Sequence, residues 1–174
     1  MSSGAVDPCR AFNSTRCEKK DAWVNPVAQI KGFVPKVDSM VSNRFLRSLA
    51  NLPATAVAAT SVLIAGGKCG YSPGHGLFVC EGSPLAQQGG TTVGDVFLTN
   101  EISKDEVLDG TANSEALLSH ETRHAAQWAG HGNLLYPILY GVEALKSTVL
   151  TGSYGCANWF EFDAGMQEGR YSSC

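Results

Sequence analysis

The chain reads Ser119-His120-Glu121-Thr122-Arg123-His124-Ala125 inside a segment with the composition of a helix. Four residues make about one turn of an α-helix, so the imidazoles of His120 and His124 leave the same face. Two imidazoles placed in this way can both reach one Zn²⁺ ion at about 2.0–2.1 Å. The spacing predicts a metal-binding helix, around which the rest of the chain is interpreted.

Glu121 lies between the two histidines in a His-Glu-x-x-His pattern. Its carboxylate can lean over the open position of the metal and take a proton from a water molecule whose pKa the ion lowers to about 7. That is the chemistry of peptide hydrolysis. The alternative is a buried helix whose two histidines and one glutamate are hydrogen-bonded core groups. Burying them together with Arg123 without a metal is costly unless every group is paired.

The residues around this motif predict a helix. Asn113 is expected to cap its N-terminus, and Glu115 lies in the first turn, where the helix dipole favours an anion. Glu115–Ala129 contains no Gly or Pro, whereas Gly130 and Gly132 are expected to end the helix. Several apolar residues predict that it packs in the core: Leu117, Leu118, Ala125, Trp128 and Ala129.

A third metal ligand is needed, and the segment just after the motif does not supply it in the metzincin pattern. That pattern places a glycine and a third histidine where this chain has Gln127 and Gly130, and the nearest histidine is His131. A glutamate from a second helix is the other known solution, and the segment Asn158–Gly165 offers Glu161, with Asp163 two residues further on.

Glu161 is the predicted third ligand. It lies among Trp159, Phe160 and Phe162, and a buried acid in such surroundings is hard to keep ionised without a cation beside it. The alternative is a capping box, in which Asn158 caps the helix and the Glu161 carboxylate accepts from the Asn158 amide.

Together these motifs resemble the gluzincin branch of the zincin metallopeptidases, over roughly residues 89–171. The resemblance rests on His120–His124 followed by Asn-x-x-Glu-x-Asp-Ala from Asn158 onward. More narrowly, the chain resembles the minimal His-Glu-x-x-His domains of secreted bacterial and toxin-like proteins. In these domains a short edge strand precedes the metal helix.

By position, the resemblance implies that His120, His124 and Glu161 bind zinc and that Glu121 is the general base. The gap from His124 to Glu161 is longer than in the family, and the following acid–Ala pair differs from the commonest Glu-x-x-Ala-Asp form. Asp163 therefore remains the second candidate ligand, or a partner that orients one of the histidines.

A strand is expected before the metal helix. The segment Gly89–Asn100 is rich in β-branched and aromatic residues, opens with a glycine pair and closes at a turn. It is interpreted as an edge strand that pairs with an extended peptide; an ordinary sheet strand is the alternative. The expected fold is α+β: a small zincin-like domain, mainly helical, with a short β-sheet whose edge strand precedes the metal-binding helix.

Upstream, the segment Val37–Leu52 predicts an amphipathic helix that ends before Pro53. The residues of its apolar face are spaced by three or four positions: Val37, Met40, Val41, Phe45, Leu49 and Leu52. Ala54–Ala65 is apolar but about half the length of a membrane span, so it is expected to be a buried helix or strand. The turn-rich segment 66–76 then predicts a loop or hairpin, in which His75 is a solvated loop residue.

Downstream, Leu134–Leu150 predicts an apolar helix that covers the site, with Pro137 tolerated in its first turn. A hydrolytic zinc site benefits from a donor aimed at the developing oxyanion. Tyr140 and His131 are the predicted catalytic donors, and Tyr136 and Tyr154 are further candidates. For each of them the alternative is an ordinary core or surface residue.

Length and composition indicate one domain over 1–174, with residues 1–36 as an N-terminal extension packed on it and 89–171 as the metallopeptidase-like core. The 174 residues are 44% hydrophobic, enough to bury a core. A net charge of −3 gives no basic footprint for nucleic acid. The N-terminus lacks the features of a signal peptide, so the chain is expected to belong to a longer protein or to be exported by another route.

The six cysteines fall as three local pairs, Cys9/Cys17, Cys69/Cys80 and Cys156/Cys174. An even number with none left over favours disulfides and a secreted or extracellular protein. Other pairings of the six stay open, as do free structural thiols. A zinc–cysteine site is disfavoured because the sequence contains no Cys-x-x-Cys.

The sequence therefore predicts a zinc-dependent endopeptidase with Zn²⁺ as cofactor and a protein or peptide as substrate. Such an enzyme fits the effector or toxin domain of a larger secreted protein, with an inhibitor or immunity protein as a further partner. No nucleic acid and no membrane span are expected. The alternative is a catalytically inactive module that keeps the zincin scaffold for binding or assembly.

Overall fold

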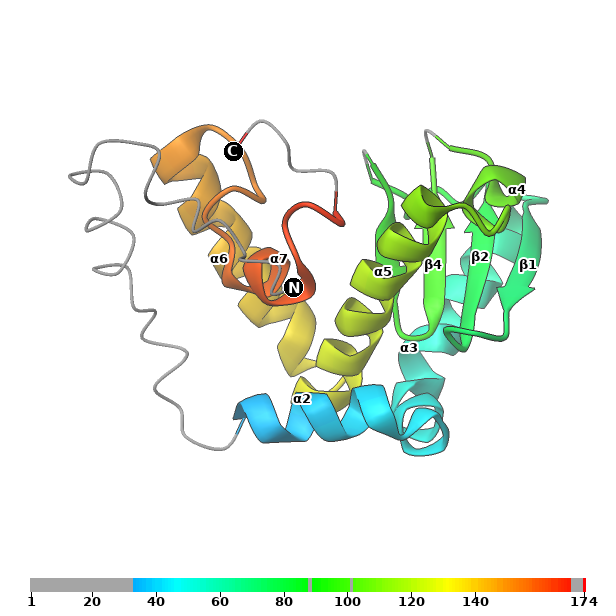
Figure 1. Cartoon of the computed structure of the whole chain (residues 1–174), viewed down its shortest axis with the longest axis horizontal. Coiled ribbons are helices and arrows are strands. Elements are labelled where there is room, and N and C mark those ends of the chain that lie inside the picture. Colours follow the sequence, from blue (N-terminus) through cyan, green and yellow to red (C-terminus); the bar gives the residue numbers. More distant parts are fainter. Residues whose placement is uncertain (1–32, 88, 101, 170–173) are drawn as a thin grey trace, which may run out of the picture. The chain divides into compact units, whose positions relative to one another are not determined.

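Helix α5 (Ala112–His131) carries both histidines and lies between a small sheet and the helices α6 (Leu135–Thr151) and α7 (Trp159–Ala164) (Figure 1). The computed structural model describes residues 33–87, 89–100, 102–169 and 174. Residues 33–174 form one unit. The expectation for residues 1–36 falls almost wholly outside the described residues.

The ends of α5 differ slightly from the prediction. Its N-cap is Thr111 and not Asn113, because the Thr111 hydroxyl accepts from the Ser114 amide at 3.3 Å. Its C-terminal cap is Gly132, with a φ of 90°. Gly130 stays inside the helix, and a Cβ there would lie 2.9 Å from Val37 Cγ2. Gly130 thus serves close helix packing rather than helix termination.

The sheet has four strands in the order β1-β2-β4-β3. Its strands are β1 (Lys68–Ser72), β2 (Leu77–Glu81), β3 (Thr91–Val93) and β4 (Val96–Thr99). β1 and β2 form an antiparallel hairpin, β4 pairs parallel with β2, and β3 pairs antiparallel with β4. The hairpin after residue 66 was one of the two predicted outcomes.

The single strand predicted for Gly89–Asn100 is wrong, because this segment is a hairpin. Gly94 has a φ of 62°, a turn conformation that glycine adopts readily, and it reverses the chain between β3 and β4. Of these two strands, β3 lies at an edge of the sheet. β4 lies inside the sheet with all four residues buried.

Upstream of the sheet, the helix predicted for Val37–Leu52 is divided. α2 (Phe33–Ser42) ends before Asn43, whose side chain caps α3 (Arg44–Ile64) by accepting from the Leu46 amide at 3.1 Å. α3 continues through Pro53 instead of ending before it. Pro53 is exposed, so water can satisfy the carbonyl that its missing N–H leaves without a helical partner. The apolar segment 54–65 is therefore helix and not strand.

The apolar face expected for this region is buried at Val37 but not in α3. Phe45, Leu49 and Leu52 are exposed, whereas Arg47 and Asn51 are fully buried. The reason is Asp95 in the β3–β4 turn, whose Oδ1 accepts from Arg47 Nε at 3.1 Å and from Asn51 Nδ2 at 2.8 Å. A buried polar network thus takes the place in the interior that the apolar pattern assigned to leucine.

The sheet is covered on both faces. β4 shows how: Phe97 packs with Leu117 and Leu118 of α5, whereas its neighbours Val96 and Leu98 pack with Ala58 and Val62 of α3. Successive strand residues point to opposite faces. Both faces of β4 are therefore apolar, and α5 is held firmly against one of them.

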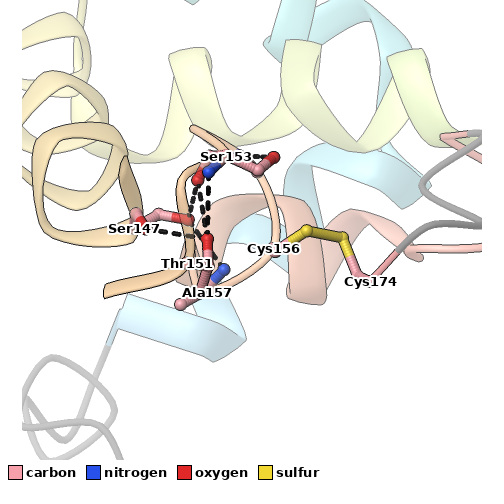
Figure 2. Close-up of a disulfide and its surroundings, with 7 residues drawn as sticks. Ser147, Thr151, Ser153, Cys156, Ala157 and Cys174 are labelled. Carbon is pink, nitrogen blue, oxygen red and sulfur yellow. Dashed lines mark hydrogen bonds between the residues drawn. A yellow bond between two sulfur atoms is a disulfide. The ribbon is translucent and has the colours of Figure 1, made fainter. Parts of the chain in front are cut away.

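Two of the three predicted disulfides lie within the described residues and are confirmed. Cys69–Cys80 joins directly paired residues of β1 and β2. Cys156–Cys174 joins the loop after α6 to residue 174 (Figure 2). That loop is folded back on α6 by Ser147, whose hydroxyl donates to the Ser153 carbonyl at 2.6 Å and accepts from the Ala157 amide at 2.7 Å. Cys9 and Cys17 lie outside the described residues.

The architecture agrees with the predicted class, a mainly helical α+β fold with a short sheet. None of its described helices combines the length and the apolar composition that crossing a membrane requires.

Candidate metal centre

His120, His124 and Glu161 converge on one point. Their candidate ligand atoms lie within 4.8 Å of one another, and all three residues are buried. The Nε2 atoms of the two histidines are 3.1 Å apart, and Glu161 Oε2 lies 3.2 Å from His120 Nε2 and 3.4 Å from His124 Nε2. The structure thus brings together the three residues predicted as ligands.

Helix α7 places the carboxylate. Asn158 caps it as predicted, with its side chain accepting from the Phe160 amide at 2.9 Å. The capping-box alternative for Glu161 is not what the structure shows. The Asn158 amide donates to the Gly155 carbonyl at 3.0 Å, while the Glu161 carboxylate faces the histidines and the Tyr140 hydroxyl.

Each imidazole is oriented by its other nitrogen. His120 Nδ1 lies 2.8 Å from the Gly165 carbonyl, an acceptor, so Nδ1 donates there and Nε2 is the nitrogen turned toward Glu161. His124 Nδ1 lies 2.8 Å from Gln127 Oε1 and 3.2 Å from the Tyr136 hydroxyl. Metal-binding histidines are commonly fixed in this way. The three residues and their hydrogen-bonded supports therefore fit a metal ion.

Asp163 supports the residues around the histidines and is not part of the group that could hold a metal ion. It accepts from Arg123 through two bonds of 2.8 Å and from Gln127 Nε2 at 2.8 Å. Gln127 in turn presents its oxygen to His124. The sequence analysis missed Gln127, although its position three residues after His124 puts both on one helix face.

The charges of the metal-free group are coupled. Burial disfavours the imidazolium of His124, but the carboxylates of Glu161 and Glu121 outweigh it and raise the pKa of His124 to about 9. Burial opposes ionisation of Glu161 as well. The charge on His124 and the hydrogen bonds from His120, His124 and Tyr140 nevertheless lower the pKa of Glu161 below its usual value.

Glu121 lies beside the three ligands on the same cavity, whose volume is about 560 Å³. Its Oε2 accepts from the Thr92 hydroxyl at 2.6 Å. Thr92 belongs to edge strand β3, and its carbonyl accepts from Trp128 Nε1 of α5 at 2.8 Å. Strand and helix thus fix the predicted base between them. Sequence reasoning did not assign Thr92 any part in the site.

The predicted oxyanion donors have different surroundings. Tyr140 lines the cavity, and its hydroxyl donates to Glu161 Oε1 at 2.5 Å. Tyr136 and Tyr154 also line it. His131 is not among the lining residues: its Nδ1 lies 2.9 Å from the Gln127 carbonyl and its ring packs on Phe160. The structure therefore brings Tyr140 to the site and leaves His131 behind it.

Two glycines complete the surroundings of His120. Gly165 supplies the carbonyl at Nδ1. The backbone of Gly169 lies against the imidazole ring, because a Cβ built on it would be 2.4 Å from Cε1. Neither residue was expected at the site. His75, predicted to be a loop residue, lies in the β1–β2 turn and takes no part in the metal cavity.

Comparison of the chain with protein-family models, with curated proteins and with solved structures found no match. What the described residues define is an α+β protein with a buried group of two histidines and one glutamate that could hold a metal ion.

Proposed function

We propose that this chain is a zinc-dependent endopeptidase. The observation that carries the proposal is the convergence of His120, His124 and Glu161 within 4.8 Å, with Glu121 on the same cavity. Catalytic zinc sites use three protein ligands of these types and keep a position for water or substrate, whereas structural sites are closed by four. Among the described residues the group has three members.

The side chains have roles that match this chemistry. A zinc ion held by the three residues would acidify a water molecule and polarise the substrate carbonyl. Glu121 would take the proton of the attacking water and deliver it to the leaving amine. The Thr92 hydroxyl orients the Glu121 carboxylate. Tyr140 is the donor that we assign to the developing oxyanion, because it lines the cavity beside Glu161.

Edge strand β3 supports a peptide as substrate. Among the described strands it has one neighbour, β4, and its residues Thr91 and Thr92 line the cavity. The outer edge of a strand offers N–H and C=O groups to an extended chain. A peptide added to β3 would pass directly beside Glu121.

The disulfides Cys69–Cys80 and Cys156–Cys174 are compatible with an extracellular protein. We extend the proposal to secretion, with the peptidase acting as the effector part of a larger protein.

The test is hydrolysis of a quenched fluorescent peptide library by protein loaded with zinc. Glu121→Gln is expected to keep one zinc ion per chain and to lose activity by about 10²–10⁴-fold, since it removes the base and no ligand. Glu115→Gln is the matched control, the same change on an exposed part of the same helix. Unchanged turnover in Glu121→Gln, or wild-type protein that binds no zinc, would contradict the proposal.

A further inference from the structure

Helix α6 contributes two small residues, Gly141 and Ala144, to the wall of the cavity that holds the candidate site. The α6 residues on the cavity are Tyr136, Pro137, Tyr140, Gly141 and Ala144. Away from the cavity the same helix carries large apolar side chains: Ile138, Val142, Leu145 and Val149. Bulk is therefore absent from α6 at Gly141 and Ala144, where the helix faces the metal donors.

Gly141 has no structural need to be glycine. It lies inside α6, where glycine is among the least favourable residues. Its φ is not in the left-handed region, and a Cβ built on it meets no atom within 4 Å. Gly130 is different, because packing against Val37 excludes a side chain there. What glycine at 141 provides is open volume on the cavity.

Apolar side chains contribute to the cavity that Gly141 lines. Ile102 and Leu117 line the cavity with Pro137, Ala144 and Tyr154. Among the described residues, its charged lining groups are those of the candidate site itself, and no lysine or arginine lines it. An anionic ligand side chain would lose hydration there without gaining a lysine or arginine partner from the described walls. A large uncharged group would bury apolar surface.

We propose that Gly141 is a specificity-determining residue, which together with Ala144 keeps open an apolar subsite for a large uncharged side chain of the peptide. This inference rests on the proposed function and names its substrate class. A longer side chain at position 141 would occupy the volume that the substrate side chain needs.

The test compares two zinc-binding probes, acetohydroxamate and phenylacetohydroxamate, titrated calorimetrically into zinc-loaded protein. Burial of the phenyl group is expected to make the larger probe bind wild-type protein about tenfold more tightly or better. In Gly141→Leu and in Ala144→Leu the ratio of the two affinities is expected to fall to about one. Val142→Leu is the control that retains the wild-type ratio, because Val142 is 61% exposed and does not line the cavity.

Gly141→Ala tests the same idea without crowding. It fills less of the cavity, so it is expected to lower the ratio in part while raising the thermal midpoint, because alanine favours the helix. Cleavage of the peptide library should follow the same order, with wild type cutting next to Leu or Phe and Gly141→Leu shifting to Ala or Gly.

The outcomes separate the two proposals. Wild-type protein that binds zinc but shows equal affinity for both probes, or a Gly141→Leu variant that keeps the wild-type ratio, would overturn the subsite and leave the metal centre standing. Failure to bind zinc, measured before any probe is added, would overturn the proposed function and the subsite with it.

Discussion

His124 carries the charge on which metal binding depends. Its imidazole is buried, yet Glu161 Oε2 at 3.4 Å favours the protonated form so strongly that the pKa reaches about 9. In the metal-free protein at neutral pH, His124 is therefore a cation paired with Glu161. A zinc ion would have to replace that proton, so protons and metal compete for one nitrogen.

The first prediction is that zinc binding at pH 7.5 releases the proton of His124. Because the pKa is raised, the proton is bound below about pH 9 and leaves as the pH rises through that value. Zinc affinity should therefore increase about tenfold per pH unit from pH 7 to 9 and then level off. Calorimetry in buffers of different ionisation enthalpy measures the released proton. A release that does not vanish above pH 9 would contradict this assignment.

The second prediction separates ligand from support. Glu161→Ala removes a donor and is expected to abolish tight zinc binding. Asp163→Ala leaves the donors in place but frees Gln127, so it is expected to cost about 10–100-fold in affinity. Competition with a fluorescent zinc chelator measures both. Similar losses of zinc affinity in the two variants would contradict the assignment of Glu161 as ligand and Asp163 as support.

For individual residues of the site, the sequence allowed prediction where the chemistry restricts which residue types can serve. The donors His120, His124 and Glu161 were predictable from spacing and from the cost of burying an acid among aromatic residues. Thr92 and Gly169 were not. A threonine in a strand and a glycine after a helix have many ordinary uses, and only the folded chain places them against Glu121 and His120.

Among the elements, α3 is joined to the sheet by a buried ion pair as well as by its apolar residues. Arg47 and Asp95 are both buried, and Arg47 Nη2 also donates to the carbonyls of His75 and Gly76 at 2.9 and 2.8 Å. The ion pair therefore joins α3, the β1–β2 turn and the β3–β4 turn. It fixes the hairpin whose Thr92 meets Glu121.

The third prediction concerns this pair. Asp95→Ala would leave Arg47 buried without its counter-charge and is expected to destabilise the protein by about 3–5 kcal/mol. Arg47→Met with Asp95→Ala removes both charges, so the double variant should lose less than the sum of the single changes. Urea unfolding measures the free energies. Additive losses would show that the two side chains do not interact.

The sequence pattern failed in this region for the same physical reason. Periodicity assumes that apolar residues point inward, and it put Phe45, Leu49 and Leu52 in the core. The Arg47–Asp95 pair, far apart in the sequence, reverses that face. The division of the predicted strand at Gly94 was open to prediction, because Gly94-Asp95 between two β-branched segments is a signal of a two-residue hairpin turn.

Over the whole molecule, the Cys156–Cys174 bridge encloses the C-terminal half of the site. Glu161, Gly165 and Gly169 all lie between the two cysteines, which are separated by 18 positions. The bridge thus restrains Glu161 and the two glycines that contact the His120 ring. The other described bridge, Cys69–Cys80, crosses β1 and β2 and encloses no residue of the metal centre.

The fourth prediction compares the two bridges. Cys156→Ala with Cys174→Ala is expected to cost about 3 kcal/mol of stability, as for other loops of this size, and to weaken zinc binding by about tenfold or more. Cys69→Ala with Cys80→Ala is the control, which should lower stability and leave zinc affinity unchanged. Thermal unfolding and chelator competition measure the two effects. A drop in zinc affinity in the control would contradict the prediction that only the Cys156–Cys174 bridge supports metal binding.

The mainly helical α+β class was predictable from the order of helical and β-rich segments. The sheet order was not, because the parallel pairing of β2 with β4 depends on a crossover that no local pattern specifies. The two described cysteine pairings were predicted correctly from proximity in sequence.

The contacts that fix the His120 ring have a consequence for how the protein would be supplied with metal. Gly165 and Gly169 hold the imidazole in place, and the three donors hydrogen-bond one another when no ion lies between them. Departure of the ion would therefore strand no unpaired charge in the interior. Small domains that fold only around zinc unfold when it is removed. We therefore expect this chain to keep its fold without the ion, so that the metal available around the protein, and not its folding, would decide whether the site is filled.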